Sequence, residues 1–418
     1  MSSKKKTNEE TQSQSLSRSI SPFMLAIYGL GTVLGAGIYV VIGEIVGEAG
    51  ALAPVAFLIA ALAAAFTAVS YAELSVRIPE SGGSSAFVAR GFSSKKLTII
   101  TGWAVIATGL VSAATITTGF VGYLNVFVEV SKWWSVPILI GLLTAVAVVG
   151  VKESAWFMVL TTLAGVIGLL IVILVAGYHL QDYPELFLNT IRDKSFSAIS
   201  MSVMLGCFLA FYSFIGFEDL VTLSEESKDV SRSLPIAIFT AVGGSLVFYL
   251  LVAAIAATAT DPTMLAESRA PLVSIVEKEG VNGKFLGALS LAIIVNGALA
   301  QIVMAGRVIY DLGVRRGGVP HWLSKVNNRT ATPVTATILC GIVVGLLALF
   351  FPTEFLAAAT SFIILAVFTC TNAALISCKR KHPKPEGIKV YPTWIPIVGI
   401  ILNLALIAGQ TLIGGGSH

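Results

Sequence analysis

The sequence predicts an all-α protein that crosses a membrane about eleven times and is built from two halves of opposite orientation. Of its 418 residues, 56% are hydrophobic and only 12% are charged. In soluble proteins about a quarter of all residues are charged, so this chain has too little polar surface to face water on all sides. Glycines also interrupt two apolar segments that are five segments apart, and this repetition indicates two halves of the same design.

Eleven apolar stretches without Lys, Arg, Asp or Glu are each long enough for a membrane helix, which needs about 20 residues. We predict two inverted halves at 20–178 and 195–378, an additional helix at 390–418, and a disordered cytoplasmic tail at 1–19. The stretches are 20–43, 49–72, 97–128, 133–151, 154–181, 195–217, 233–260, 285–306, 330–353, 355–378 and 390–418.

The positive charges predict the orientation. With the amino terminus in the cytoplasm, the cytoplasmic segments hold 20 of the 27 Lys and Arg residues and the outer loops hold 6. Cytoplasmic loops of membrane proteins carry such an excess. We therefore expect a multi-pass protein of the cell membrane with a cytoplasmic amino terminus. The basic balance reflects this topology and does not indicate a nucleic-acid partner.

The first apolar segment carries Gly29, Gly31, Gly35 and Gly37 near its middle, and the sixth carries Gly216 close to its end. Glycine gives the backbone freedom to leave helical geometry. Inside a bilayer, broken helices are tolerated only where protein or a cavity surrounds them. Two halves of inverted topology that each open with an interrupted helix indicate the core of a secondary transporter.

Such a break offers binding groups for a small molecule with a carboxylate and an ammonium. We expect the N–H groups of Gly35, Ala36 and Gly37 to bind the carboxylate. Freed carbonyl groups would accept from the ammonium, and Phe214 beside the second break would act as a gate. The candidate carbonyls belong to Val33, Phe211, Tyr212 and Ile215.

Both features also have a purely structural interpretation. Gly31 and Gly35 form a GxxxG pattern, which often only lets helices pack closely. Aromatic residues such as Phe211 and Phe214 are commonly core residues.

Charged residues near the breaks are candidates for ion coupling. Glu218 follows the second break directly, and charges inside a membrane are often functional. Glu44, Glu73 and Asp219 are further acids in or near the apolar segments, and they could equally lie at helix ends in water.

The sequence contains no signature of an enzyme. Its four histidines lie outside the predicted membrane cores, and its four cysteines have no metal-site spacing. A phosphate-binding loop and a nucleophile elbow are both missing from the sequence. We therefore expect no catalytic residues, no metal and no cofactor.

Five stretches, in this order, resemble the amino acid–polyamine–organocation superfamily, and within it the bacterial and archaeal cationic amino acid transporter branch. The resemblance covers nearly the whole chain and implies the five-plus-five inverted repeat of the bacterial leucine transporter. It also implies proton-coupled uptake or exchange of amino acids by alternating access, with sodium less expected. The stretches are GTVLGAGIYVVIGEIVGEAG (31–50), YAELSVRIPESGGSSAFV (71–88), GVKESA (150–155), CFLAFYSFIGFEDLVTLSEESKDVSRSLPIAI (207–238) and AGRVIYDLGVRRGGVPHWL (305–323).

Two positions depart from this family. Proton-coupled relatives carry a lysine on the fifth helix, where this chain has Gly165. Either another titratable group such as Glu218 carries the proton, or the protein exchanges or equilibrates substrate without lysine-linked coupling. Cationic relatives often carry an acid on the third helix, where this chain has Thr108. We therefore expect Thr108 to line the substrate site and to favour neutral substrates.

Two other functions fit the same pattern. A polyamine or small-amine carrier would need additional carboxylates in its pocket. A membrane sensor would bind an amino acid without moving it. The sequence predicts amino acids or small amines and the lipid bilayer as partners and leaves the oligomeric state open.

Overall fold

The computed structural model describes residues 21–414 except 81, 151–154, 328 and 331. The predicted tail at 1–19 and the last residues of the 390–418 segment lie outside the described part. In the first half the helices are α1 (Pro22–Val33), α2 (Ala36–Ala49), η1 (Gly50–Leu52), α3 (Ala53–Arg77), α4 (Gly83–Phe92), α5 (Lys95–Leu124), α6 (Lys132–Val149) and α7 (Ala155–Ala176). They continue with η2 (Gly177–Gln181), α8 (Tyr183–Asp193), α9 (Phe196–Tyr212), η3 (Phe217–Glu226), α10 (Val230–Ala259), α11 (Pro262–Glu267), α12 (Pro271–Lys278), α13 (Lys284–Asp311), η4 (Leu312–Arg316), α14 (Val334–Phe350), α15 (Thr353–Lys381) and α16 (Trp394–Gly414).

Each of the eleven predicted segments overlaps an apolar helix, and the first, 20–43, spans two, α1 and α2. Among the described residues, nine helical stretches are long and apolar enough to cross a membrane, and Val334–Phe350 is a shorter apolar helix. The first of the nine stretches, Pro22–Arg77, contains two predicted segments.

Local signals set several helix starts. The side chain of Ser21 accepts a hydrogen bond from the N–H of Met24, and Pro22 occupies the first helical position. Ser131 and Ser195 cap α6 and α9 in the same manner. These residues satisfy N–H groups that a helix leaves without partners at its start.

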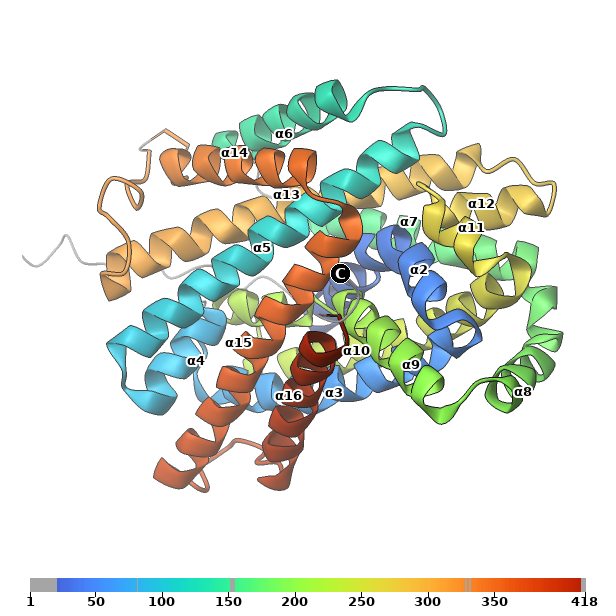
Figure 1. Ribbon diagram of the computed structural model, residues 1–418. Coiled ribbons are helices and arrows are strands. Elements are labelled where there is room, and N and C mark those ends of the chain that lie inside the picture. The colour runs from blue at the N-terminus through green and yellow to red at the C-terminus, as the bar shows by residue number, and fades with distance from the viewer. Residues whose placement is uncertain (1–20, 81, 151–154, 328, 331, 415–418) are drawn as a thin grey trace, which may run out of the picture.

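Helices that are distant in the chain form two groups (Figure 1). In one group, α1 packs against α10, α10 against α3, and α9 against α2 and α3. In the other, α5 packs against α13, and α14 packs against both α5 and α6. α7 contacts α1 and α13, so it lies between the groups.

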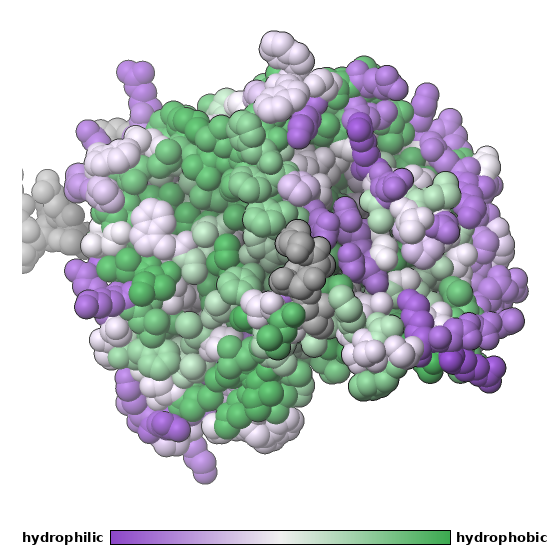
Figure 2. Space-filling view, in the orientation of Figure 1, coloured by the Kyte–Doolittle hydropathy of each residue, from purple (hydrophilic) through white to green (hydrophobic). Residues whose placement is uncertain are grey.

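Figure 2 shows a broad hydrophobic area in the middle of one face, with hydrophilic residues gathered toward its left and right edges. Large apolar side chains are exposed on the molecule; Leu142 of α6 and Leu174 of α7, for example, are 62% and 82% exposed. This distribution is the one expected of a protein surrounded by lipid.

Short helices at one end of the molecule pack onto α2. Cβ atoms added at Gly43 and Gly47 would lie 2.4 Å from the Leu265 carbonyl oxygen and 2.7 Å from the Ala266 Cβ of α11. α12 also contacts α2 and α7. The loop between α10 and α13 therefore covers this end of the broken helix.

Candidate functional site

The first helix break lies at Leu34 and Gly35, between α1 and α2. Gly35 has a ψ of -146°, outside the helical range, and it has no side chain to cap α2. The N–H groups of the first turn of α2, from Ala36 onward, therefore have no partner within the helix. They lie at the positive end of the helix dipole. Gly35 and Gly37 are both partly exposed, so an anionic group can approach this backbone.

The second break comprises Ser213 to Gly216, between α9 and η3. Gly216 has a φ of +128°, which residues with side chains rarely adopt. A Cβ at this position would lie 2.9 Å from the carbonyl oxygen of Thr32. The Thr32 hydroxyl donates to the Gly216 carbonyl at 3.3 Å, and the Gly216 N–H donates to the Glu218 carboxylate at 2.8 Å. Glycine is therefore required here by both conformation and space.

The two breaks lie against each other. A Cβ at Gly37 would be 3.0 Å from the Cα of Ser213. The Ser213 side chain is buried, and its hydroxyl has no hydrogen-bond partner within the described part of the chain. The Tyr249 hydroxyl of α10 lies 2.5 Å from the Val33 carbonyl oxygen and 2.8 Å from that of Ser213. The carbonyl that we predicted for Val33 as a substrate acceptor thus already accepts from Tyr249.

The other predicted backbone residues lie at the breaks and are buried. Ala36 and Ile215 are 4% and 8% exposed. The carbonyls of Phe211 and Tyr212 accept from the N–H groups of Phe214 and Ile215 at 3.0 and 3.2 Å. These two carbonyls are therefore already used in the turn, although each retains a second lone pair.

Aromatic rings surround the second break. The Phe214 ring centroid lies 6.3 Å from that of Phe57 and 5.1 Å from that of Tyr249. Phe211 packs against Phe368 of α15 at 5.9 Å. Phe214 is completely buried inside the group of α3, α9 and α10. Its role as a gate stays a prediction.

Gly31 and Gly165 show how α7 meets the first break. A Cβ at Gly31 would lie 1.9 Å from the Thr162 hydroxyl of α7, so this glycine of the GxxxG pattern serves close packing. A Cβ at Gly165 would lie 3.9 Å from the Leu34 carbonyl oxygen. Position 165 therefore faces the break, as expected for the position that carries a lysine in proton-coupled relatives.

Thr108 lines a pocket next to the second break, together with Glu218, Asp219 and Gln301. The pocket has about 440 Å³ of empty space, which includes open solvent. Gln301 donates to the Asp219 carboxylate at 3.3 Å. Neither carboxylate forms an ion pair with another described residue. The structure thus corrects the expectation of an acid-free surrounding for Thr108.

The residues that the structure describes include no group of three His, Cys, Asp or Glu side chains close enough to hold a metal ion.

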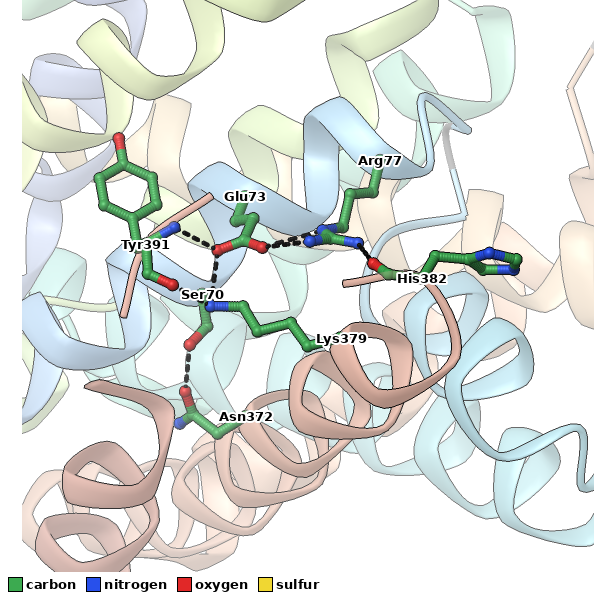
Figure 3. Close-up of polar contacts among 7 residues, drawn as sticks. All are labelled: Ser70, Glu73, Arg77, Asn372, Lys379, His382 and Tyr391. Atoms are coloured by element: carbon green, nitrogen blue, oxygen red, sulfur yellow. Dashed lines mark hydrogen bonds and ion pairs between the residues drawn. The ribbon is translucent and has the colours of Figure 1, made fainter. Parts of the chain in front are cut away.

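Glu73 belongs to a charged cluster whose partners sequence reasoning missed (Figure 3). Its carboxylate lies 2.7 Å from Arg77 and 2.9 Å from Lys379, and its side chain is completely buried. It also accepts from the Tyr391 N–H at 3.0 Å, while Arg77 donates to the His382 carbonyl at 2.9 Å. The cluster joins α3 to α15 and to the segment before α16. The alternative of a helix-end carboxylate in water is therefore wrong for Glu73.

Polar side chains continue this connection along α3. Ser70 donates to the Asn372 side chain at 2.5 Å, and Asn372 donates to Thr67 at 3.0 Å. Asn403 of α16 also donates to Thr67 at 3.3 Å. Hydrogen bonds between membrane helices add to their association, so α3, α15 and α16 are fastened along their buried faces.

Two solved structures resemble this fold. The crystal structure of MhsT in complex with L-phenylalanine has a TM-score of 0.61 at 13% identity, covering 96% of this chain and all of that one. A substrate-bound, outward-open Na⁺-coupled sialic acid symporter has a TM-score of 0.57 at 14% identity, covering 96% of this chain and 91% of that one. At these identities the similarity concerns the fold alone, and it confirms the predicted five-plus-five inverted repeat.

Curated relatives are transporters. The methylthioribose transporter of Bacillus subtilis (strain 168) is 28% identical over 94% of this chain and 87% of its own. The branched-chain amino acid permease BcaP of the same organism is 26% identical with the same coverage. The human cationic amino acid transporter 4 is 27% identical over 92% of this chain and 63% of its own. Residues 20–417 match the family model described as amino acid permease. The protein therefore belongs to the amino acid permease family of the amino acid–polyamine–organocation superfamily and is a membrane transporter.

Proposed function

We propose that this protein is a secondary transporter that moves amino acids across the cell membrane by alternating access. One observation carries the proposal. The uncapped amino terminus of α2 lies against Ser213, whose buried hydroxyl has no partner among the described residues. A substrate carboxylate is the ligand that backbone N–H groups and a hydroxyl would bind together at a helix start.

The ammonium of the substrate needs hydrogen-bond acceptors at the same place. Because Val33, Phe211 and Tyr212 already accept within the protein, we assign the ammonium to the carbonyl of Ile215, which lies in the second break. Ala36 and Gly37 then hold the carboxylate and Ile215 the ammonium, so both charged groups of an amino acid contact the broken helices.

Alternating access follows from the two helix groups. The group of α1, α3, α9 and α10 would rock against the group of α5, α6, α13 and α14, with the substrate at the breaks between them. The count of positive charges supports a cytoplasmic amino terminus and therefore a cytoplasmic position for the pocket lined by Thr108 and Gly82.

We assign the coupling proton to Glu218. Its carboxylate accepts from the N–H of Gly216 inside the second break, and it lies beside Asp219. Protonation would neutralise one of two neighbouring acids and change the contact that holds the break. Gly165 has no group that could carry the proton.

Uptake into proteoliposomes should rise several-fold when an inward proton gradient is applied. The Glu218→Gln variant should lose this rise but keep exchange of internal for external substrate, because the glutamine cannot release a proton. Glu80→Gln, at an exposed position after α3, is the control and should behave like the wild type. Uptake that ignores pH and protonophores but follows sodium would contradict proton coupling.

A second candidate function is the carriage of cationic amino acids or small amines. Glu218 and Asp219 face the pocket beside Thr108 without a cation from the described residues. Two carboxylates of this kind would offset the desolvation of a second substrate ammonium.

Competition experiments separate the two candidates. If the pocket takes a cationic side chain, lysine should inhibit uptake at least tenfold better than norleucine, which has the same carbon chain without the terminal ammonium. Asp219→Asn should remove most of this difference. Equal inhibition by the two amino acids would restrict the protein to neutral substrates.

A further inference from the structure

We propose that Tyr249 is the positioning residue of the substrate site: its hydroxyl joins the two broken helices and sets the distance between them. The inference rests on the proposed function only in that the site between the breaks binds an amino acid. It concerns a side chain from α10, a continuous helix that contains neither of the two breaks.

The hydroxyl contacts both breaks where the helix before each break ends. Val33 is the last residue of α1, and Ser213 is the first residue after α9. Tyr249 lies 2.5 Å and 2.8 Å from their carbonyl oxygens. Carbonyls at the end of a helix have no partner in the next turn, and each break removes the turn that would have supplied one. One hydroxyl proton therefore serves two freed carbonyls.

The phenol ring cannot easily move away from this position. Tyr249 is completely buried. Its ring centroid lies 5.3 Å from that of Phe57 on α3 and 5.1 Å from that of Phe214. α10 packs along both α1 and α3. The ring thus holds the hydroxyl at a fixed point between the two half-helices.

This position also relates Tyr249 to the proposed ligand groups. The carbonyl of Ser213 accepts a hydrogen bond from Tyr249. The Cα of Ser213 also lies close to Gly37, because a Cβ added to Gly37 would be 3.0 Å from it. A shift of Ser213 relative to α1 would change the gap into which a substrate carboxylate must fit. Tyr249 therefore acts on binding through the backbone and does not need to touch the substrate.

Thr32 makes a second, weaker connection between the same breaks: its hydroxyl lies 3.3 Å from the Gly216 carbonyl oxygen and 2.9 Å from the Gly29 carbonyl oxygen of its own helix. The two connections lie on either side of the turn at 213–216. We expect the turn to keep its course without Tyr249 but to lose its fixed distance from α1.

The test removes one hydroxyl. Tyr249→Phe keeps the ring and its aromatic contacts. The matched control is Tyr123→Phe, because Tyr123 is equally buried and donates to the Tyr39 carbonyl of α2 at 2.9 Å, so its hydroxyl bond does not join one break to the other. Each variant of the full-length protein would be compared with the wild type by amide hydrogen exchange and by equilibrium binding of amino acids.

Tyr249→Phe should speed amide hydrogen exchange at least tenfold, both in peptides that cover 34–38 and in peptides that cover 213–217. It should also weaken amino acid binding at least tenfold. Tyr123→Phe should leave both breaks and the affinity within about twofold of the wild type, although the two variants lose similar thermal stability. Faster exchange in only one break, or equal affinities in the two variants, would overturn the proposal.

Replacement of Tyr249 by 4-aminophenylalanine restores a donor for both carbonyls and should recover binding and slow exchange. This variant also keeps the proposal testable if Tyr249→Phe does not fold. If the amino variant does not restore wild-type amide hydrogen exchange at the two breaks, a donor role for Tyr249 is contradicted. A wild type that binds no amino acid would refute the proposed function, while the exchange measurement would still decide the role of Tyr249.

Discussion

Gly216→Ala should abolish amino acid transport, whereas Gly243→Ala should leave it unchanged. Gly216 has a φ of +128°, and a Cβ there would lie 2.9 Å from the Thr32 carbonyl oxygen and 3.0 Å from its carbonyl carbon. The methyl group would force the turn at 213–216 away from α1. At Gly243, in the middle of α10, no atom beyond the adjoining residues and backbone of the same helix lies within 4 Å of the added Cβ. Alanine should stabilise that helix by about 1 kcal/mol.

Uptake into proteoliposomes at equal protein content measures this difference. We expect less than about one thirtieth of wild-type uptake for Gly216→Ala, because a loss of about 2 kcal/mol of binding free energy lowers the affinity about thirtyfold. A Gly216→Ala protein that is monodisperse and transports normally would show that the second break is not part of the substrate site.

Glu73→Gln should have the largest effect on stability. The variant keeps the size of the side chain but removes the negative charge between Arg77 and Lys379, whose side chains are each only 6% exposed. Breaking a buried ion pair by removing one partner costs about 3–5 kcal/mol, because the remaining charge stays buried without compensation. Here two cations would remain. Glu80→Gln, three residues beyond the end of α3 and exposed, should cost almost nothing.

Thermal unfolding in detergent tests this expectation, with the fraction of protein that stays monodisperse as the readout. Lys379→Met should destabilise less than Glu73→Gln, since Glu73 and Arg77 still neutralise each other. If Glu73→Gln and Glu80→Gln unfold at the same temperature, the cluster does not hold α3 to α15 as its geometry implies.

The membrane helices and both breaks could be predicted from sequence because their signals are local. Hydropathy marked all eleven segments. The glycines at 35 and 216 marked the breaks, since few other residues fit such backbone. The short helices α4, α8, α11 and α12 were missed because each has at most eleven residues and lacks the long apolar pattern used to find the others.

The contacts that hold the breaks could not be predicted. Tyr249 lies 216 positions from Val33, and Ser70 lies 302 positions from Asn372. No pattern in a single sequence connects such pairs. The partners of Glu73 were missed for the same reason. Arg77 is one turn away on its own helix, but Lys379 and Tyr391 come from the other end of the chain.

Thr108 shows the same limit in the pocket. Cationic relatives often carry an acid on α5 where the chain has Thr108. The helix considered alone therefore indicated a pocket without charge. The carboxylates beside it come from η3, more than one hundred residues later. Specificity therefore depends on residues that only the folded chain brings together.

Equilibrium binding to the purified wild-type protein tests most directly whether the two helix breaks bind an amino acid. The twenty amino acids would be screened first, followed by the methyl ester of the tightest ligand. We expect at least one amino acid to bind with a dissociation constant below about 1 mM. We also expect its ester to bind at least one hundredfold more weakly, because the ester cannot present a carboxylate to the amino terminus of α2. A folded protein that binds no amino acid, or that binds acid and ester equally, would contradict this site.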